Sequence, residues 1–598
     1  MIALQAQFGS TNHESRITNH ELVQVEIVLR TPWDGPWLSF QNPSAVITAL
    51  EPGDVGRCLD EAERACREGF YAAGFVTYEA AAAFGLPVHA PVRGGLPLAC
   101  FGIFPRENVH RTAAVEFDGD GIPNWTASID RDEYACAFRR IKEHIASGDT
   151  YQLNFTFRLR SRFDGDPRGL FADLVAAQRG AWSAYVDLGT HAICSASPEL
   201  FFSLNGGRIE CRPMKGTMPR GLTSAADAMQ AQHLHTSAKN RSENVMIVDL
   251  VRNDLGRIAR VGSVTVDSLF DVERYPRHWQ MTSTVTADVN GTSLAGIFAA
   301  LFPSGSVTGA PKQRSMEIIR TLEPAPRGMY TGAIGMIDPL GRSHFNVAIR
   351  SVTIDRTRQE AEFGVGSGIV WESIERNEYD ECQIKAAILT TRELPFRLLE
   401  TLKWEPESGF VLLDRHLDRL HRSADYFAFQ VPIVDVRATL ERALSGRVRA
   451  AKVRVLLAQD GEVDCEVLDL GSVPEHPLRV ALAASPVSTN DVFLYHKTTR
   501  RAVYERARAS RPDVDAVLLW NEDGEMTEGT ETNLVVELDG RRVTPPVECG
   551  LLAGTLRAEL LARGEIAEER VPKDALARAT RMWLINSVRG WMEAELVS

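Results

Sequence analysis

The sequence changes character at residues 391–396, where the short segment TRELPF separates two regions with different patterns. A chain of 598 residues is also longer than the roughly 100–200 residues of one domain. No repeat or low-complexity linker marks the junction, so we expect it to be short. The sequence therefore predicts a large first domain at 23–392 and a smaller second domain at 396–598.

Both regions mix helix and strand patterns, which indicates an α+β fold. In the first region, strand-like runs such as 184–188 and 345–353 alternate with helical patterns and glycine-rich turns. One helix is expected over 133–147, where apolar residues recur at helical spacing up to Gly148. The second region opens with a helical pattern at 414–427.

Composition excludes several classes of protein. Sixty-six basic residues against 79 acidic ones give a net charge of −13, which disfavours binding to a phosphate backbone. The nine cysteines include no CxxC pair, so a zinc ribbon or a redox dithiol is not expected. No apolar run reaches the ~18 residues of a membrane span or forms a signal peptide. We therefore expect a cytoplasmic enzyme without nucleic-acid or membrane partners, preceded by an unstructured segment at 1–22.

Five motifs in the first region have residues suited to an anionic ligand. A lysine lies in RPMKGT at Lys215, and Glu243 begins a segment that continues to RNDLG. The Gly/Ser/Thr-rich segments 302–312 and 364–369 are expected to be loops that offer N–H and hydroxyl donors. The segment 378–385 (EYDECQIK) then combines two glutamates with a lysine. Each motif alone is weak, and each residue could be an ordinary surface or turn residue, but together they are specific.

In this order, the motifs resemble the chorismate-utilising enzymes, which include anthranilate, aminodeoxychorismate, isochorismate and salicylate synthases. The resemblance implies a large α/β sandwich with a deep site for chorismate. It also implies that Glu243 and Glu381 bind Mg²⁺, with Glu378 acting through water. One or two carboxylates, completed by water and substrate, are what Mg²⁺ usually takes from a protein.

Chorismate is a dianion and needs cations and N–H donors around it. The resemblance implies that these come from the following substrate-binding residues: Thr308, Gly309, Arg350, Gly366, Gly368 and Lys385.

The context of Lys215 resembles that of aminodeoxychorismate synthases. The implied mechanism is covalent, with a neutral Lys215 amine attacking carbon 2 of the ring while the 4-hydroxyl leaves. Burial or neighbouring charge must lower the lysine pKa for such a step. Glu199 matches the family's general acid/base, with a structural ion-pair role as the alternative.

A second motif bears on the choice of reaction. Gln280, in RYPRHWQMTSTV, occupies the position where anthranilate-forming members have a histidine, although a shift of two residues would place His278 there. A glutamine cannot protonate a leaving group at neutral pH, which favours an aminodeoxychorismate product over anthranilate. An isochorismate or salicylate synthase, which uses its lysine to activate water, stays open.

Ammonia has no source in this chain. None of the nine cysteines lies in the G-x-C-x-G context of a glutaminase nucleophile. The sequence therefore predicts a separate glutamine amidotransferase subunit as a partner.

The second region resembles fold-type IV pyridoxal-phosphate enzymes. Its motifs are FLYHKTTRR at 493–501, TEGTETN at 527–533 and GLLAGTLR at 550–557. The resemblance implies that Lys497 carries the cofactor and moves protons, and that Glu528 lies against the pyridine nitrogen. It also implies a homodimer through this domain. The expected phosphate ligands are Arg419, Thr555 and Leu556, although GTLR replaces the family's usual G-[IV]-T-R.

The two halves together predict a bifunctional enzyme that makes 4-aminobenzoate, a folate precursor. The first half would aminate chorismate, and the second would eliminate pyruvate from the product. Two alternatives stay open: an amino-acid aminotransferase as the second domain, or an anthranilate- or isochorismate-type synthase followed by a non-catalytic C-terminal module.

Overall fold

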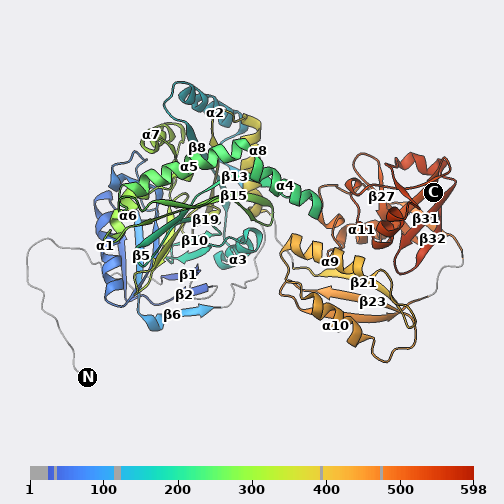
Figure 1. The fold of residues 1–598 in the computed structure, drawn as a ribbon. Helices are drawn as coiled ribbons and strands as arrows, with labels where there is room; N and C mark the ends of the chain where they lie inside the picture. The colour runs from blue at the N-terminus through green and yellow to red at the C-terminus, as the bar shows by residue number, and fades with distance from the viewer. Residues whose placement is uncertain (1–24, 33–36, 113–122, 391–394, 472–475, 598) are drawn as a thin grey trace, which may run out of the picture. The chain divides into compact units, whose positions relative to one another are not determined.

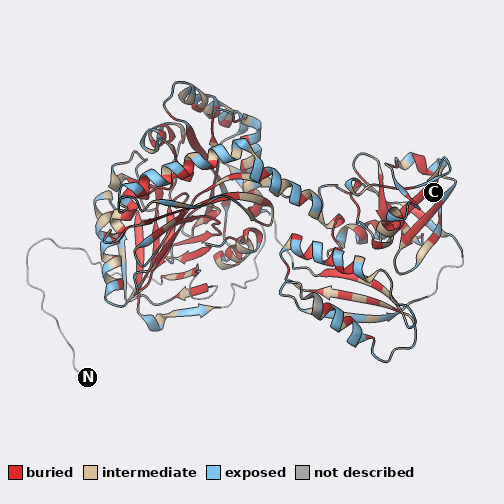
Figure 2. Ribbon diagram, viewed as in Figure 1, coloured by how far each residue is buried: buried red, intermediate tan, exposed pale blue. Residues whose placement is uncertain are grey.

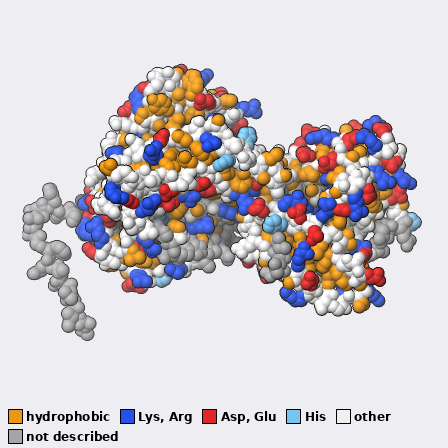
Figure 3. All heavy atoms as spheres, in the orientation of Figure 1, with side chains coloured by type: hydrophobic (Ala, Val, Ile, Leu, Met, Phe, Trp, Pro, Cys, Tyr) orange, Lys and Arg blue, Asp and Glu red, His pale blue; other side chains and the backbone are white. Residues whose placement is uncertain are grey.

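The structure, a computed structural model, describes residues 25–32, 37–112, 123–390, 395–471 and 476–597 (Figure 1). The segment 1–22 and the expected junction at 392 lie outside these residues. Within them, no helix is long and apolar enough to cross a membrane. The chain forms two compact units, one of which contains Met1–Thr217, Ser237–Tyr275 and Gln280–Glu393. On the face shown in Figure 3, basic and acidic side chains are interspersed over each unit.

The first unit is built on two large sheets. One sheet has the order β16 (Gly309–Ala310), β8 (Gln152–Arg162), β20 (Glu360–Ile369), β19 (Ser351–Asp355), β10 (His191–Ser195), β9 (Ala184–Asp187), β1 (Glu26–Arg30), β2 (Trp37–Phe40) and β6 (Val109–Thr112), with β7 (Thr126–Ala127) beside β8. The other has the order β13 (Met214–Pro219), β15 (His278–Asp288), β12 (Arg208–Arg212), β11 (Leu200–Asn205), β18 (Ser343–Val347), β17 (Ala333–Ile337), β4 (Tyr71–Val76), β5 (Ala99–Phe104) and β3 (Ala45–Ala49), with β14 (Thr265–Arg274) beside β15.

Helices cover the outer faces of this sandwich. They are α1 (Pro52–Arg67), α2 (Arg131–Ala146), α3 (Pro167–Gln178), α5 (Ala238–Gly256), α6 (Leu294–Leu301), α7 (Lys312–Leu322) and α8 (Glu375–Ala386). Buried side chains of α1, α5 and α6 form one apolar cluster with the second sheet, and those of α2, α3 and α8 form another with the first. A third cluster lies between the sheets. The interior strands are accordingly buried, whereas the helices expose one face (Figure 2).

Several expected elements are confirmed, and two are corrected. The helix expected over 133–147 is α2, which begins with a capping box between Asp130 and Glu133. The single strand expected over 345–353 is wrong, because the chain breaks between β18 and β19, where Arg350 has a left-handed φ of 54°. The loop expected over 364–369 is also wrong, since this segment lies within strand β20 and pairs with β8.

The second unit has a small and a larger sheet. The small sheet has the order β22 (Gly409–Phe410), β21 (Leu398–Glu405), β23 (Ala451–Leu457) and β24 (Val463–Asp469). The larger has the order β27 (Met526–Gly529), β26 (Ala516–Trp520), β25 (Leu478–Leu482), β32 (Gly590–Leu596), β31 (Arg581–Asn586), β28 (Asn533–Leu538), β29 (Arg541–Thr544) and β30 (Ala567–Glu568). Its helices are α4 (Ser224–Thr236), α9 (Leu413–Phe427), α10 (Ile433–Ala443), α11 (Ala502–Ser510) and α12 (Thr555–Ala562).

Not all of the second unit comes from the end of the chain. It includes Met218–Thr236 and Pro276–Trp279, which precede the predicted boundary. Arg220 joins these segments to α9. Its guanidinium donates two hydrogen bonds to Asp227, at 2.7 Å each, and lies 5.2 Å from the ring centroid of Trp279 and 4.2 Å from that of Tyr426. The ion pair between Arg220 and Asp227 is largely buried and therefore fixes Met218–Thr236 firmly to the unit.

Candidate active sites

Lys215 lies on β13 and points toward β20. A side-chain carbon built on Gly368 would be 2.3 Å from the Lys215 Nζ, so any side chain there would force the amine to move. Within the described residues, this Nζ makes no hydrogen bond. Burial lowers its pKa, although the carboxylates of Glu243, Glu381 and Glu199 act in the opposite direction. A lysine that is easier to deprotonate is suited to act as a nucleophile.

Glu199 lies just before β11 and is almost fully buried. Ser306 donates a hydrogen bond of 2.5 Å to its Oε1. Burial raises the pKa of this carboxyl to about 7, with Ser306 and Lys215 acting against the rise. A carboxyl group with this pKa is partly protonated at neutral pH, so it can give a proton to a leaving group and take one back.

Three carboxylates come together from helices α5 and α8. Burial raises the pKa of Glu243 and of Glu378, and in both cases neighbouring carboxylates add to the rise. In Glu381, the effect of burial is outweighed by Lys385, whose Nζ lies 2.5 Å from the carboxylate and lowers its pKa. Carboxylates that raise one another's pKa are a site where a cation is favourable.

These carboxylates fit Mg²⁺ as an ion shared with substrate. No group of three or more His, Cys, Asp or Glu within the described ranges is arranged to hold a metal alone. Mg²⁺ commonly takes one or two carboxylates and completes its shell with water and substrate oxygens. Glu243 and Glu381 therefore suit the predicted ion, with Glu378 next to them.

Arg350 and Lys385 converge on the strand that holds Gly368. The Arg350 Nη1 donates to the Lys385 carbonyl at 2.5 Å, and the Lys385 Nζ donates to the Gly366 carbonyl at 2.9 Å. Burial lowers the pKa of Arg350 to about 10, so it stays cationic at neutral pH. The left-handed φ of Arg350 breaks the strand pattern at a predicted substrate-binding position. Gly366 meets Lys385 through its carbonyl oxygen, rather than offering only an N–H group as expected.

The predicted donor segment at 302–312 is a loop only in part, because it contains a short 3-10 helix at Gly305–Val307, strand β16 and the first residue of α7. The Thr308 hydroxyl is already engaged. It donates to the Ser304 carbonyl at 3.0 Å, so its proton is used within the loop. Gly309 is packed so tightly that a side chain there would meet the Gln152 carbonyl at 2.2 Å. The Thr308 hydroxyl is therefore not available as a donor to a substrate, and both residues shape the loop.

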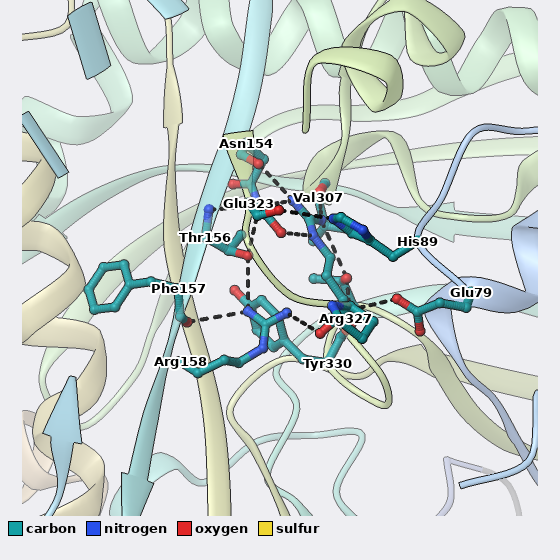
Figure 4. A network of polar contacts seen from close by, with 12 residues as sticks. Glu79, His89, Asn154, Thr156, Phe157, Arg158, Val307, Glu323, Arg327 and Tyr330 are labelled. Carbon is teal, nitrogen blue, oxygen red and sulfur yellow. Dashed lines mark hydrogen bonds and ion pairs between the residues drawn. The ribbon is translucent and has the colours of Figure 1, made fainter. Parts of the chain in front are cut away.

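A buried polar network holds this loop from behind (Figure 4). The guanidinium of Arg327 donates to the Val307 carbonyl at 2.7 Å and to the Asn154 carbonyl at 2.9 Å, and it also binds Glu323 at 2.7 Å. Glu79 accepts from the Arg327 backbone N–H at 2.7 Å. Such a network, in which every member has a partner, rigidifies the loop. Sequence reasoning missed Arg327 because nothing nearby in the sequence marks it.

Gln280 lies next to the strand that bears Lys215. Its Nε2 donates to the Gly216 carbonyl at 2.8 Å, and its Oε1 accepts from the Thr217 hydroxyl at 3.1 Å. His278 is the first residue of β15, the strand that contains Gln280; it is buried and engaged with other groups. The glutamine thus contacts Gly216 and Thr217, the two residues that follow Lys215.

The second unit has its own lysine–glutamate pair. Burial lowers the pKa of Lys497 to about 8, and Arg419 and Arg501 add to the decrease. Burial raises the pKa of Glu528 to about 7, whereas the Tyr504 hydroxyl, which donates to its Oε1 at 2.8 Å, acts against the rise. Tyr504 was not predicted, because a tyrosine on a helix gives no signal of its own.

Arg419 is held in place by a glutamate. Its Nε and Nη2 donate to the two oxygens of Glu400 at 2.9 and 2.7 Å, and its Nη1 donates to the Ala553 carbonyl at 3.1 Å. His416 binds Glu400 at 2.7 Å and the Thr555 hydroxyl at 3.1 Å. Glu400 is buried, but Arg419 and, to a lesser degree, His416 outweigh that effect and lower its pKa to about 2. The Thr555 hydroxyl is thus engaged by His416.

These groups line a cavity of about 380 Å³, whose walls include Arg419, Lys497, Arg501, Tyr504, Glu528 and Thr555. Thr555 and Leu556 are the first residues of helix α12, whose first-turn N–H groups are free to bind an anion. A phosphate there, a lysine to hold an aldehyde and a glutamate to hold a ring nitrogen are what pyridoxal 5′-phosphate requires. The residues therefore fit this cofactor.

Two family models match successive parts of the chain. Residues 111–391 match the family described as chorismate binding enzyme, and residues 397–597 match amino-transferase class IV. The chain joins a chorismate-binding domain to a class IV aminotransferase domain. The α+β fold class predicted from the sequence is confirmed.

The first domain is similar to enzymes with two different products. It is 43% identical over 258 residues to aminodeoxychorismate synthase component 1 of Salmonella typhimurium, covering 43% of this chain and 56% of that protein. It is 36% identical over 267 residues to anthranilate synthase component 1 of Aquifex aeolicus, covering 44% of this chain and 54% of that protein. The chain thus spans a little over half the length of these relatives.

One solved structure shares the fold of this domain. Anthranilate synthase component I of Streptococcus pneumoniae superposes with a TM-score of 0.51 at 23% identity, covering 65% of this chain and 95% of that one.

Proposed function

We propose that the protein converts chorismate and ammonia to 4-amino-4-deoxychorismate in its first domain and eliminates pyruvate from that product in its second, forming 4-aminobenzoate. The observation that supports amination in the first domain is the desolvated amine of Lys215. Glu199 is a nearby acid/base, and Gln280 lies beside the strand of Lys215. A glutamine there cannot drive pyruvate elimination, so a second site must complete aromatisation.

Lys215 acts first as a nucleophile. Its Nζ bonds to ring carbon 2, both ring double bonds shift by one position around the ring, and the carbon–oxygen bond at carbon 4 breaks. Glu199 gives its proton to the departing hydroxyl, which leaves as water. Ammonia then bonds to carbon 4, the bond to Lys215 breaks, and the surplus proton returns to Glu199. The lysine is released unchanged.

The remaining residues of the first site bind the substrate. Glu243 and Glu381 would hold Mg²⁺, which would neutralise charge on a substrate carboxylate. Arg350 and Lys385 supply the fixed positive charge for the substrate's carboxylates, with Gly366, Gly368 and the loop at Thr308 and Gly309 around the ring.

In the second site, Arg419 and the N–H groups of Thr555 and Leu556 would hold the phosphate of pyridoxal 5′-phosphate, and Glu528 would hold a proton on the pyridine nitrogen. When bound, this cofactor supplies an electron sink. Lys497 moves the protons: its Nζ takes one from the amine-bearing ring carbon and returns one as the bond to the enolpyruvyl oxygen breaks and pyruvate leaves.

We further propose a glutamine amidotransferase subunit as the source of ammonia, because the cysteines are not in a glutaminase context. Seven of the nine cysteines are buried, and burial raises the pKa of several thiols, including Cys58 and Cys100, to about 12. A cytoplasmic location and a homodimer through the second domain complete the proposal.

The test is to supply the purified chain with chorismate, Mg²⁺, pyridoxal 5′-phosphate and an ammonium salt and to identify the aromatic product. We expect 4-aminobenzoate and pyruvate in equal amounts. Anthranilate, or salicylate, would instead contradict the assignment of the first domain.

A second candidate concerns the C-terminal domain alone, whose family is named for aminotransferases. An amino-acid aminotransferase would transfer nitrogen from D-alanine or a branched-chain amino acid to 2-oxoglutarate. Supplied 4-amino-4-deoxychorismate separates the two activities, because the lyase forms 4-aminobenzoate without any keto acid.

A further inference from the structure

The cavity around Lys497 holds more positive charge than the cofactor uses. The charged side chains among its described lining residues are six basic and two acidic: Arg419, Lys452, Arg454, Lys497, Arg501 and Arg589, and Glu528 and Glu531. In the arrangement proposed above, Arg419 binds the phosphate of the cofactor and Glu528 its ring nitrogen. Most of the other cations have no counterpart on the cofactor, so they indicate a substrate that is itself an anion.

Two of these cations come from one strand of the small sheet. Lys452 and Arg454 are two residues apart on β23, so their side chains point to the same face of the sheet. The opposite face of the strand carries Val453 and Val455, which are buried in an apolar cluster with residues of α9 and α10. The alternation of the strand therefore directs both cations toward the cavity.

The partners of these two cations leave them available to a ligand. Lys452 makes no hydrogen bond or ion pair with any other described residue. Arg454 donates to Glu466 at 2.9 Å, but the two side chains are 35% and 46% exposed, and an ion pair at such a site contributes little free energy. Arg501, by contrast, is already engaged, because it donates to the Thr530 carbonyl at 2.6 Å.

The charge of the proposed substrate matches this wall of the cavity. 4-Amino-4-deoxychorismate is a dianion, with one carboxylate on its ring and another on its enolpyruvyl group. D-alanine or a branched-chain amino acid has only one carboxylate and an apolar side chain. A cation that loses water to an apolar side chain gains no partner in return, which is unfavourable.

We propose that Lys452 and Arg454 bind the carboxylates of the substrate in the second domain and so make this site selective for a dicarboxylate. This inference rests on the proposed function, since it takes 4-amino-4-deoxychorismate as the ligand. The two residues contact the substrate and have no part in holding the cofactor.

The experiment measures the lyase reaction of the full chain with pyridoxal 5′-phosphate on supplied 4-amino-4-deoxychorismate, without Mg²⁺. We expect Lys452→Met to raise KM about tenfold, which is about 1.4 kcal/mol, and to leave kcat nearly unchanged, because a carboxylate remote from the reacting bonds is bound equally before and during the reaction. Adding Arg454→Met should raise KM further. Lys452→Arg keeps the charge and should recover most of the loss.

Chorismate supplies a second readout, because it has the same two carboxylates but a hydroxyl in place of the amine. It should inhibit the lyase competitively, and Lys452→Met should raise its inhibition constant by about the same factor as KM. Lys403→Met is the matched control. Lys403 pairs with Lys452 in the sheet but is not among the residues that line the cavity, and it forms an ion pair with Glu405 at 2.6 Å. Its substitution should change neither constant.

An unchanged KM and inhibition constant in the Lys452→Met, Arg454→Met double variant would overturn the inference, as would an equal effect of Lys403→Met. Glutamate is also a dicarboxylate, so transamination from glutamate to pyruvate is measured in parallel. An increase in KM for glutamate alone would overturn the assignment to 4-amino-4-deoxychorismate. If the unsubstituted protein forms no 4-aminobenzoate from the supplied substrate, the proposed function itself is contradicted.

Discussion

The two units contain the same pair of groups in opposite electrostatic surroundings. In each, burial lowers the pKa of a lysine, Lys215 or Lys497, and raises the pKa of a glutamate, Glu199 or Glu528, to about 7. The charged groups nearest to the two lysines differ in sign. Carboxylates surround Lys215, which leaves a place for a metal ion, whereas arginines adjoin Lys497, which leaves a place for a phosphate. In the proposed reactions, burial would prepare the reactive groups, and the neighbouring charges would select the ligand.

The largest expected effect separates the two lysines. Lys215→Ala should abolish amination of chorismate while lyase activity on supplied 4-amino-4-deoxychorismate continues, and Lys497→Ala should do the reverse. Loss of a covalent nucleophile costs roughly a millionfold in rate. Both rates are measured in each variant. Loss of both activities in either variant would contradict the independence of the sites.

A smaller effect is expected on the stability of one unit. Arg220→Ala leaves Asp227 buried without its cation, which costs about 3–5 kcal/mol of unfolding free energy. Differential scanning calorimetry should show only the transition of the second unit moving to lower temperature. Arg252→Ala, which removes an exposed ion pair with Asp249, is the control and should change neither transition.

The metal requirement distinguishes the first site from the second. Glu243→Gln removes a carboxylate from the proposed Mg²⁺ site, so half-maximal amination should need roughly 10- to 100-fold more Mg²⁺. Lyase activity should not respond to Mg²⁺ in either protein. An unchanged titration of amination would show that Glu243 is not a ligand.

The smallest effects test the two glutamates. The hydroxyls of Tyr504 and Ser306 each lower the pKa of a carboxyl, so Tyr504→Phe and Ser306→Ala should raise the pKa values of Glu528 and Glu199 above about 7. The two pKa shifts should change the two activities in opposite ways. Lyase activity needs Glu528 ionised, so its acidic limb should move to higher pH. Amination needs Glu199 protonated, so its basic limb should also move up, which extends activity. We expect shifts of about one pH unit, read from pH–rate profiles.

Residue patterns predicted much of the fold locally. The helices α2 and α9 and the strand β9 lie close to where periodicity placed them, because each has a strongly amphipathic or β-rich sequence. Strand breaks were harder to predict. Nothing in the run 345–353 signals the left-handed φ of Arg350, whose guanidinium contacts the carbonyl of Lys385, a residue remote in the sequence.

For the two sites as well, local motifs could be predicted from the sequence and tertiary contacts could not. Motif residues such as Lys215, Glu199, Lys497 and Glu528 were identifiable in the sequence, because their chemical types occur at characteristic spacing. The pairing of these glutamates was not identifiable. Ser306 lies in the predicted donor segment 302–312, but only the tertiary structure shows that it donates to Glu199, and a tyrosine on a helix gives no signal that it donates to Glu528.

The sequence by itself determined the types of reactive group and the order of the two domains along the chain. The tertiary structure decided which of those groups are desolvated, which carboxylates approach one another, and that Met218–Thr236 packs within the second unit. The physical reason is that a pKa depends on burial and on charges a few ångströms away. Such distances are set by contacts between residues that are remote in the sequence.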